Sequence, residues 1–314
     1  MKSNTKWVAI NCLVAVTIFA VSCTTVYVED VEDDENETSP WETMDTDVPK
    51  RLRDGWGDCF SNIFMVGDSG TIIRYDGETW EEMDSSTSER LYGIWGSSCN
   101  DIFSVGQDGS IVHYDGNAWS SMVSGTNMSL FDVWGTSSFN LFAVGWHGTI
   151  LHYDGTTWTP MSSGTVVPLY GIWGSSSSDI FVVGNWGTIL HYDGNSWTEM
   201  EIDTKALLRG IWGASSEDVF VVGYDGTILH YDGDIWSEML SNTTEHLFSI
   251  WGDSSLDIFI VGHGGTIQQY SSGTWTSIYS GVSLNLKSVI GNAPHGIFAI
   301  GYGAILHLIE GTHN

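Results

Sequence analysis

The sequence predicts an all-β fold, a seven-bladed β-propeller of 39-residue repeats with four strands each. Two observations predict it: a strict internal period of 39 residues and four strand-like segments within each period. A third observation, the way in which the two chain ends complement each other, predicts a closed ring. Glycine is abundant (37 residues) and proline scarce (5), which suits short strands joined by tight turns.

The period is visible at three apolar positions. A leucine recurs every 39 residues, at Leu52, Leu91, Leu130, Leu169, Leu208, Leu247 and Leu286. A tryptophan keeps the same interval from Trp56 to Trp251, with Ile290 at the seventh position, and a phenylalanine does so from Phe64 to Phe298. A fixed period near 40 residues is typical of a repeat architecture.

Each period contains four segments with the composition of short strands. In the fourth copy they are LYGIW, DIFVV, TILHY and SWTEM, and GSSSSD, GNWG and DGN separate them. The segments are rich in β-branched and aromatic residues, and no stretch of about 11 residues or more has a helical apolar period. Four strands in about 40 residues make one propeller blade.

The chain ends predict how the ring closes. The seventh repeat supplies LKSVI, GIFAI and AILHL and then lacks a fourth strand. Upstream of the first repeat, WETM at Trp41–Met44 aligns with WEEM at Trp80–Met83, again at an offset of 39 residues. We therefore expect residues 40–314 to form one domain in which Trp41–Met44 completes the C-terminal blade and covers its exposed sheet edge.

Residues 1–22 have the features of a lipoprotein signal peptide. Lys2 and Lys6 precede an apolar run of 16 residues that ends before Cys23. This is a secretory pattern, and the run is shorter than the ~20 residues of a membrane span. The AVSC at Ala20–Cys23 resembles a bacterial lipobox, although that pattern prefers Leu at Ala20. The resemblance implies lipidation of Cys23 and anchoring in a bacterial cell envelope, at the outer membrane or the cell surface. The alternative is a secreted protein that is cut near Ser22.

Residues 23–39 are expected to form a disordered tether after the lipidated cysteine. Seven of the nine residues from Glu29 to Glu37 are acidic, and such a block repels itself and stays extended. A sorting function remains open, because acidic stretches near a lipidated cysteine resemble surface-export signals of some Gram-negative groups.

The charge of the chain restricts its partners. The formal net charge is -29, from 39 acidic and 10 basic residues, and phosphate backbones are bound by clusters of Lys and Arg. We therefore expect no nucleic-acid partner. We expect membrane contact through the lipid anchor alone, and a monomer.

One repeated phrase carries a family resemblance. The stretch VGNWGTILHYDGNSW resembles the repeats of bacterial Asp-box propellers, including the photosystem II assembly-factor and sialidase-like groups, and is not far from kelch repeats. The usual Asp-box reads Ser-x-Asp-x-Gly-x-Thr-Trp, whereas this chain has Tyr-Asp-Gly-x-x-Trp. The resemblance spans every blade and implies the propeller fold. It implies little about activity, since one fold hosts many functions.

A repeated histidine could suggest a metal site. His113, His152, His191, His230 and His307 occupy one repeat position, with Arg74 and Gln269 in the other two blades. Zinc needs three or four ligands at one centre, whereas equivalent positions on third strands diverge from the ring axis. We interpret these histidines as structural, bonded to a neighbouring blade or turn, and the Asp of each Asp-Gly pair as turn chemistry. No metal or cofactor is expected.

Positions that differ between repeats are free of the structural demands of the repeat. The residue after each leucine begins the innermost strand and should face the channel mouth on the face that we call the top. These residues are Arg53, Tyr92, Phe131, Tyr170, Arg209, Phe248 and Lys287. The turns between second and third strands should emerge on the same face, and their large side chains are Trp146, His147, Trp186, Tyr224, His263 and Tyr302. Aromatic platforms beside polar groups suit protein or sugar recognition; the alternative is packing between turns.

The cysteines allow a disulfide bond. Cys59 and Cys99 fall in corresponding first-to-second turns of neighbouring blades, and an extracytoplasmic setting permits oxidation. A bridge requires Cα atoms within ~7 Å, so both the bridge and two free thiols remain open.

Two functions of different classes fit the sequence. The first is a binding or scaffold propeller, tethered to the envelope, that recognises a protein partner or a glycan on its top face; it takes no cofactor. The second is a carbohydrate-active enzyme, a sialidase-like glycosidase or a lyase. A retaining glycosidase needs two carboxyl groups ~5 Å apart, and Asp54, Asp132, Asp68, Asp108 and Asp225 are the candidates near the channel mouth.

Overall fold

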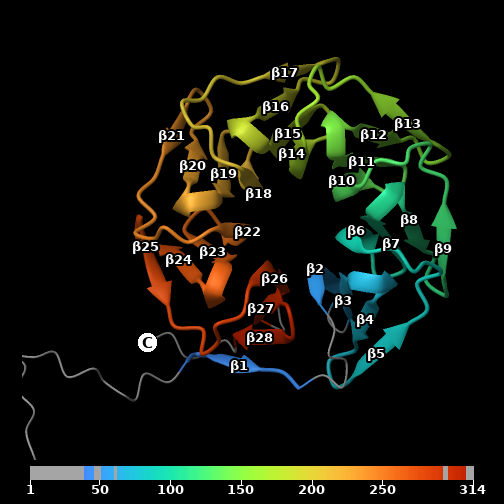
Figure 1. The fold of residues 1–314 in the computed structure, drawn as a ribbon, viewed down its shortest axis with the longest axis horizontal. Coiled ribbons are helices and arrows are strands. Elements are labelled where there is room, and N and C mark those ends of the chain that lie inside the picture. Colours follow the sequence, from blue (N-terminus) through green and yellow to red (C-terminus); the bar gives the residue numbers. More distant parts are fainter. Residues whose placement is uncertain (1–38, 46–50, 60–61, 293–295, 309–314) are drawn as a thin grey trace, which may run out of the picture. The chain divides into compact units, whose positions relative to one another are not determined.

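The structure is a computed structural model that describes residues 39–45, 51–59, 62–292 and 296–308. The predicted signal peptide, Cys23 and the acidic segment lie outside these residues. The described chain forms seven antiparallel sheets of four strands each, arranged in a ring (Figure 1). The predicted seven-bladed propeller is confirmed.

Each blade runs from a long inner strand beside the ring axis to a short strand at the rim (Figure 1). The inner strands are β2 (Leu52–Cys59), β6 (Leu91–Ser98), β10 (Leu130–Ser137), β14 (Leu169–Ser176), β18 (Leu208–Ser215), β22 (Leu247–Ser254) and β26 (Leu286–Asn292). The second strands are β3 (Asn62–Gly67), β7 (Asp101–Gly106), β11 (Asn140–Gly145), β15 (Asp179–Gly184), β19 (Asp218–Gly223), β23 (Asp257–Gly262) and β27 (Gly296–Gly301).

The third and fourth strands follow after tight turns. The third strands are β4 (Ile72–Tyr75), β8 (Ile111–Tyr114), β12 (Ile150–Tyr153), β16 (Ile189–Tyr192), β20 (Ile228–Tyr231), β24 (Ile267–Ser271) and β28 (Ala304–Leu308). The rim strands are β5 (Trp80–Met83), β9 (Trp119–Met122), β13 (Trp158–Met161), β17 (Trp197–Glu199), β21 (Trp236–Glu238), β25 (Thr274–Ile278) and β1 (Trp41–Thr43).

Short 3-10 turns join the second and third strands of six blades. They are η1 (Asp68–Gly70), η2 (Gln107–Gly109), η3 (Trp146–Gly148), η4 (Asn185–Gly187), η5 (Tyr224–Gly226) and η6 (His263–Gly265). Within the described residues, no helix has the length and apolarity that crossing a bilayer requires.

The ring closes through the N-terminal strand, as predicted. Strand β1 pairs antiparallel with β28, with Trp41 opposite Leu308 and Thr43 opposite Leu306. The strand is one residue shorter than the predicted Trp41–Met44, but the Met44 N–H still donates to the Ile305 carbonyl at 2.8 Å. The last blade is thus built from both ends of the propeller, and β1 covers the edge of β28 that would otherwise be open.

The core lies between blades. Phe181 on β15 is 2% exposed, and its ring centre lies 5.7 Å from that of Tyr231 and 6.3 Å from that of Trp236 in the next blade. Corresponding clusters of buried apolar residues recur around the ring. Both faces of each second strand are buried in this way, which explains the continuous apolar run of segments such as DIFVV.

The recurring Trp-Gly pair has a packing reason. A side chain at Gly213 would place its Cβ 2.6 Å from the ring of Trp173, the tryptophan of the preceding blade. The same close approach joins Gly174 to Trp134 at 2.7 Å. The inner strands can therefore sit this close together only when the residue after each tryptophan lacks a side chain.

Candidate functional site

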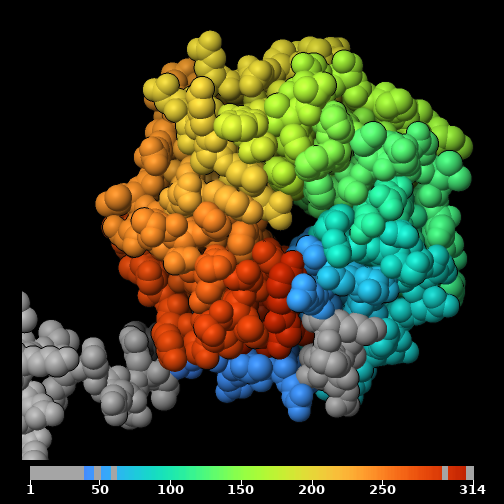
Figure 2. Space-filling model, viewed as in Figure 1, coloured from blue at the N-terminus to red at the C-terminus, as the bar shows by residue number. Residues whose placement is uncertain are grey.

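The seven residues that follow the repeat leucines line one cavity at the centre of the ring. The cavity has a volume of about 150 Å³. Its wall contains Arg53, Tyr92, Phe131, Tyr170, Arg209, Phe248 and Lys287. We call these residues the central ring. Figure 2 shows a narrow opening at the middle of the ring of blades.

Cations and aromatic rings are paired across blade boundaries in the central ring. The Arg209 guanidinium carbon lies 4.8 Å from the centre of the Tyr170 ring, and the Lys287 Nζ lies 3.6 Å from that of Phe248. The Arg53 guanidinium carbon lies 5.1 Å from the centre of the Tyr92 ring. Each cation–π contact contributes about 0.5–2 kcal/mol and fixes the direction of a long side chain.

The positive charges of the central ring are crowded. Burial, followed by the nearby charges of Arg209 and Arg53, lowers the pKa of Lys287 to about 8. Burial also lowers the pKa of the Arg209 guanidinium. The charge of Arg53 is compensated by an ion pair with Asp68 at 2.5 Å. Among the described residues, neither Arg209 nor Lys287 has an ion-pair partner. An anion at the mouth would relieve this crowding.

Two buried carboxyl groups also border the cavity, and both join neighbouring blades. Asp54 accepts the Ile94 N–H at 3.1 Å and the Ser288 hydroxyl at 2.7 Å. Asp132 accepts the Ile172 N–H at 3.0 Å. In the sixth blade the Ser249 hydroxyl oxygen likewise accepts the Val289 N–H of the next blade at 3.2 Å.

Burial raises the pKa of both carboxyl groups. It raises the pKa of Asp54 to about 6, against hydrogen bonds that lower it. It raises the pKa of Asp132 to about 8, and the charge of Asp54 adds to this effect. The position two residues after each repeat leucine reads Asp54, Gly93, Asp132, Gly171, Gly210, Ser249 and Ser288. The sequence therefore held a signal for an acceptor that links blades.

Three of the predicted turn residues extend the central ring outward. The Tyr302 ring lies 5.4 Å from the Arg53 guanidinium carbon and 5.1 Å from the Lys287 Nζ, measured to its centre. The Trp146 ring centre lies 6.3 Å from that of Phe131, and the Tyr224 ring centre lies 6.2 Å from that of Phe248.

None of the six predicted turn residues is in the wall of the cavity itself, and the other three contact different residues. His147 lies beside Trp146, with ring centres 6.0 Å apart. His263 places its Nδ1 2.7 Å from a carboxylate oxygen of Glu245. Trp186 is 67% exposed and borders a separate groove. The predicted top-face residues thus fall into two regions.

His246 belongs to the same face and was missed by the sequence analysis. Its ring stacks on Tyr224 with centres 4.0 Å apart, and its Nδ1 accepts the Asp225 N–H at 3.1 Å. The residue before each repeat leucine varies, as Arg51, Arg90, Ser129, Pro168, Leu207, His246 and Asn285. The argument from variability, applied one position earlier, would have found it.

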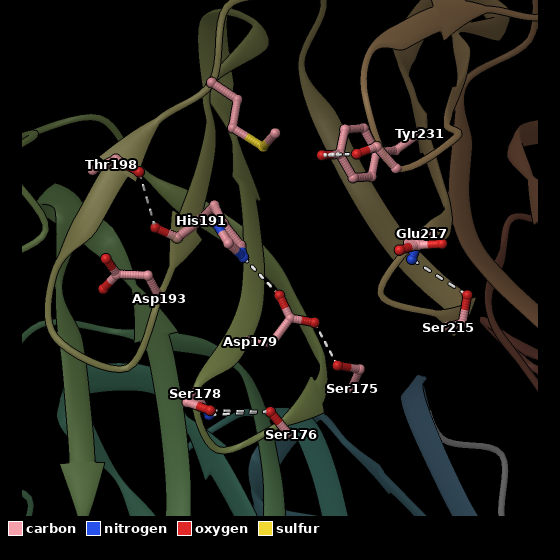
Figure 3. Close-up of polar contacts among 12 residues, drawn as sticks. Ser175, Ser176, Ser178, Asp179, His191, Asp193, Thr198, Ser215, Glu217 and Tyr231 are labelled. Carbon is pink, nitrogen blue, oxygen red and sulfur yellow. Dashed lines mark hydrogen bonds and ion pairs between the residues drawn. The ribbon is translucent and has the colours of Figure 1, made fainter.

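The repeated histidines are structural. His191 on β16 bonds through Nε2 to Asp179 on β15 at 2.7 Å, and Asp179 also accepts the Ser175 hydroxyl (Figure 3). His113 and His230 form the same bond to Asp101 and Asp218, each at 2.7 Å. The expected partner in a neighbouring blade or turn was wrong, because the bond stays within one blade. Among the described residues, no cluster of His, Cys, Asp or Glu could hold a metal ion.

We expect His191→Gln to leave the stability almost unchanged and His191→Leu to lower it. In the sixth blade Gln269 already replaces the histidine and donates to Asp257 at 2.9 Å. Leucine removes the donor and leaves the partly buried Asp179 short of a partner, which costs about 1–3 kcal/mol. Urea unfolding of the two variants checks this, and equal loss in both would contradict it.

The aspartates of the Asp-Gly pairs also have the expected turn role. Asp193 accepts the N–H groups of Asn195 at 2.8 Å and Ser196 at 2.9 Å. These bonds lower the pKa of Asp193.

Cys99 is disulfide-bonded. The Cys59 side chain lies outside the described part of the chain, so the pairing of Cys59 with Cys99 stays a prediction.

Solved structures share this fold. No protein-family model and no curated protein sequence matches the chain. YCF48 bound to a D1 peptide superposes with a TM-score of 0.74 at 17% identity, over 88% of this chain and 96% of that one. YCF48 from Cyanidioschyzon merolae superposes with a TM-score of 0.71 at 14% identity, over 87% of this chain and 99% of that one. A streptogramin B lyase superposes with a TM-score of 0.76 at 13% identity, over 85% of this chain and 96% of that one. These likenesses establish a propeller fold.

Proposed function

We propose that this protein is a binding propeller that receives an acidic group of a protein partner at the mouth of its central cavity. One observation carries the proposal: the seven central-ring positions, which the repeat leaves free to vary, line one cavity in which Arg209 and Lys287 stack on aromatic rings. Cations whose direction is already fixed by contact with aromatic rings bind an anion with little further loss of side-chain freedom.

The size of the cavity favours a protein partner over a glycan. Its volume of about 150 Å³ is below the ~300–1,000 Å³ of a usual small-molecule pocket. A carboxylate side chain or a chain terminus fits this space better than a sugar ring with its neighbours. The remaining contacts of a protein partner would lie on Tyr302, Trp146 and Tyr224 around the mouth. The peptide complex of YCF48 shows that a propeller of similar fold can bind a peptide.

The proposal predicts that partner capture depends on the central cations. The propeller, residues 39–314, is immobilised and used to capture proteins from solubilised envelopes of its own host. We expect Arg209→Gln/Lys287→Gln to weaken capture of the specific partner at least about tenfold, since charged hot-spot contacts carry much of the binding energy. The control Arg74→Gln/Lys205→Gln has the same net charge and changes residues that are not in the cavity wall. Equal capture by all three proteins would contradict the proposal.

A carbohydrate-active enzyme is the second candidate, because two acids, two arginines and two tyrosines line one cavity. The hydrogen bonding of the acids argues against it. Asp54 and Asp132 each accept a backbone N–H from the next blade, and Ser249, which cannot act as an acid, makes the same link. Release of a chromophore from aryl sialosides by the wild-type domain but not by Asp132→Ser would favour the enzyme.

We further propose that Cys23 anchors this propeller in a bacterial envelope by lipidation. The AVSC at Ala20–Cys23 and the preceding apolar run support this, and stable anchoring needs more than one acyl chain. Cys23→Ser should abolish incorporation of labelled palmitate in the host and move the protein to the soluble fraction. Membrane association that persists in this variant would contradict the anchor.

A further inference from the structure

A second surface stands out because the fourth blade departs from the repeat at two adjoining places. One is the turn η4, which carries Trp186, and the other is the connection 200–206 after the rim strand β17. Together with the start of β21 they border a groove of about 1,060 Å³. Its lining residues include Trp186, Met200, Ile202, Ile235 and Trp236.

Trp186 occupies a backbone position that suits it poorly. Its φ is +58°, in the left-handed region, and the corresponding residues of other turns have φ between +55° and +63°. Those residues are mostly small or polar: Ser69, Asp108, His147, Asp225 and Gly264. A bulky side chain in this region is uncommon and strained, and such strain gathers at functional sites. Because Trp186 is 67% exposed, little packing within the fold compensates for the strain.

The connection 200–206 has lost a structural feature of the other blades. In five of those blades a buried serine donates to the carbonyl two residues later, as Ser163 does to Thr165 at 3.2 Å and Ser241 to Thr243 at 3.1 Å. The fourth blade has Ile202 at this position, and Ile202 and Trp236 both pack against one cluster of buried apolar residues. The substitution turns a polar turn into an apolar wall of the groove.

The rim of the groove is acidic. Glu199, Glu201, Asp203 and Asp234 are among its lining residues, with no lysine or arginine. Lys205 lies in the same connection but is not part of the lining. Ile235, 60% exposed, adds an apolar surface beside Trp186. An exposed tryptophan beside apolar and charged residues is typical of a protein interface.

We propose that this groove binds a basic peptide segment of a protein partner, with an apolar side chain of the segment against Trp186 and its lysines or arginines along the acidic rim. Charge complementarity selects this occupant. The chain's own segment from Glu29 to Glu37 is acidic, and a second copy carries the same net charge of -29, so both would be repelled. The groove therefore differs in ligand from the central cavity, which favours an anion, and the inference stands apart from the proposed function.

The test uses a short fluorescent peptide in which lysine alternates with phenylalanine, titrated against the propeller by fluorescence anisotropy. We expect binding that weakens with salt, at least about tenfold weaker binding when glutamate replaces the lysines, and a similar loss when serine replaces the phenylalanines. Trp186→Ser should weaken binding about tenfold or more. The matched control His147→Ser changes the same turn position in the third blade and should bind within about twofold of the wild type.

Folding does not confound this comparison. Serine is already present at the same turn position as Ser69, so the melting temperature of Trp186→Ser should not fall. A second variant, Glu199→Gln/Asp203→Asn, removes rim charge without touching the turn and should reduce both the affinity and its salt dependence.

Three results would overturn the inference. The first is no binding by the wild type up to ~1 mM peptide, a limit that corresponds to negligible affinity. The second is equal affinity in wild type and Trp186→Ser, which would place the peptide elsewhere on the acidic surface. The third is a wild-type dimer that Trp186→Ser dissociates, which would mean that a second copy fills the groove.

Discussion

Deleting residues 39–45 should destabilise the propeller by more than about 4 kcal/mol, the largest effect that the structure predicts. Trp41 is 4% exposed and packs in one cluster with Leu286, Leu308 and Phe259, the last from the sixth blade. Truncating a buried tryptophan alone costs about 3–5 kcal/mol. The deletion also opens β28 as an exposed edge, which promotes association between chains.

Urea unfolding of residues 39–314 and 46–314 measures this effect. Trp41→Ala should account for most of the loss, whereas Thr43→Ala, at an exposed position of the same strand, should change stability by less than about 0.5 kcal/mol. The deleted form should also sediment with increasing mass at higher concentration. An unchanged unfolding midpoint would contradict closure of the ring by β1.

Asp132→Ser should stabilise the propeller at pH 8 and flatten its stability profile. Folding raises the pKa of Asp132 from its usual value of 3.8 to about 8. Between these values the folded chain holds a proton that the unfolded chain releases, so the contribution of Asp132 to stability is most favourable below pH ~4 and declines as the pH rises toward ~8. Each unit of pKa shift corresponds to about 1.4 kcal/mol in the free energy of unfolding. We expect a gain of only about 2–3 kcal/mol, because the carboxyl borders a cavity that can hydrate it.

Serine is a suitable replacement because Ser249 already makes the equivalent link to Val289. Unfolding measured from pH 4 to pH 9 should show the slope of the wild type reduced in Asp132→Ser. The pKa of Asp54 is raised only to about 6. Asp54→Ser should therefore reduce the dependence of stability on pH only below about pH 6. A wild-type stability that rises steadily from pH 5 to pH 8 would contradict the assignment.

The architecture could be predicted from sequence because the repeat exposes it many times. The recurring leucine, tryptophan and phenylalanine fix the strand register in every blade, and the match of Trp41–Met44 to Trp80–Met83 fixes the closure. The central ring followed from the same register, since the residue after each leucine must face the axis once the inner strand is placed.

The groove and the linking acids could not be predicted in the same way. The separate position of Trp186 could not be predicted, because the groove depends on a backbone angle at Trp186 and on Ile202, which replaces the serine of other blades. Asp54 and Asp132 were seen as acids near the channel, but their hydrogen bonds reach a residue 40 positions further on. Such bonds depend on how closely two inner strands approach, which the glycines and tryptophans of the repeat decide jointly.

Site-specific photo-crosslinking in the host envelope tests most directly whether the cavity mouth binds a protein partner. A photoreactive amino acid replaces Tyr170 on β14, in the central ring. In the control it replaces Asn195, which lies in the turn between β16 and β17. We predict one covalent adduct with a partner protein from position 170, none with that partner from position 195, and loss of the adduct in Arg209→Gln/Lys287→Gln. No adduct from position 170, or an adduct that the double variant leaves unchanged, would contradict a binding site at the cavity mouth.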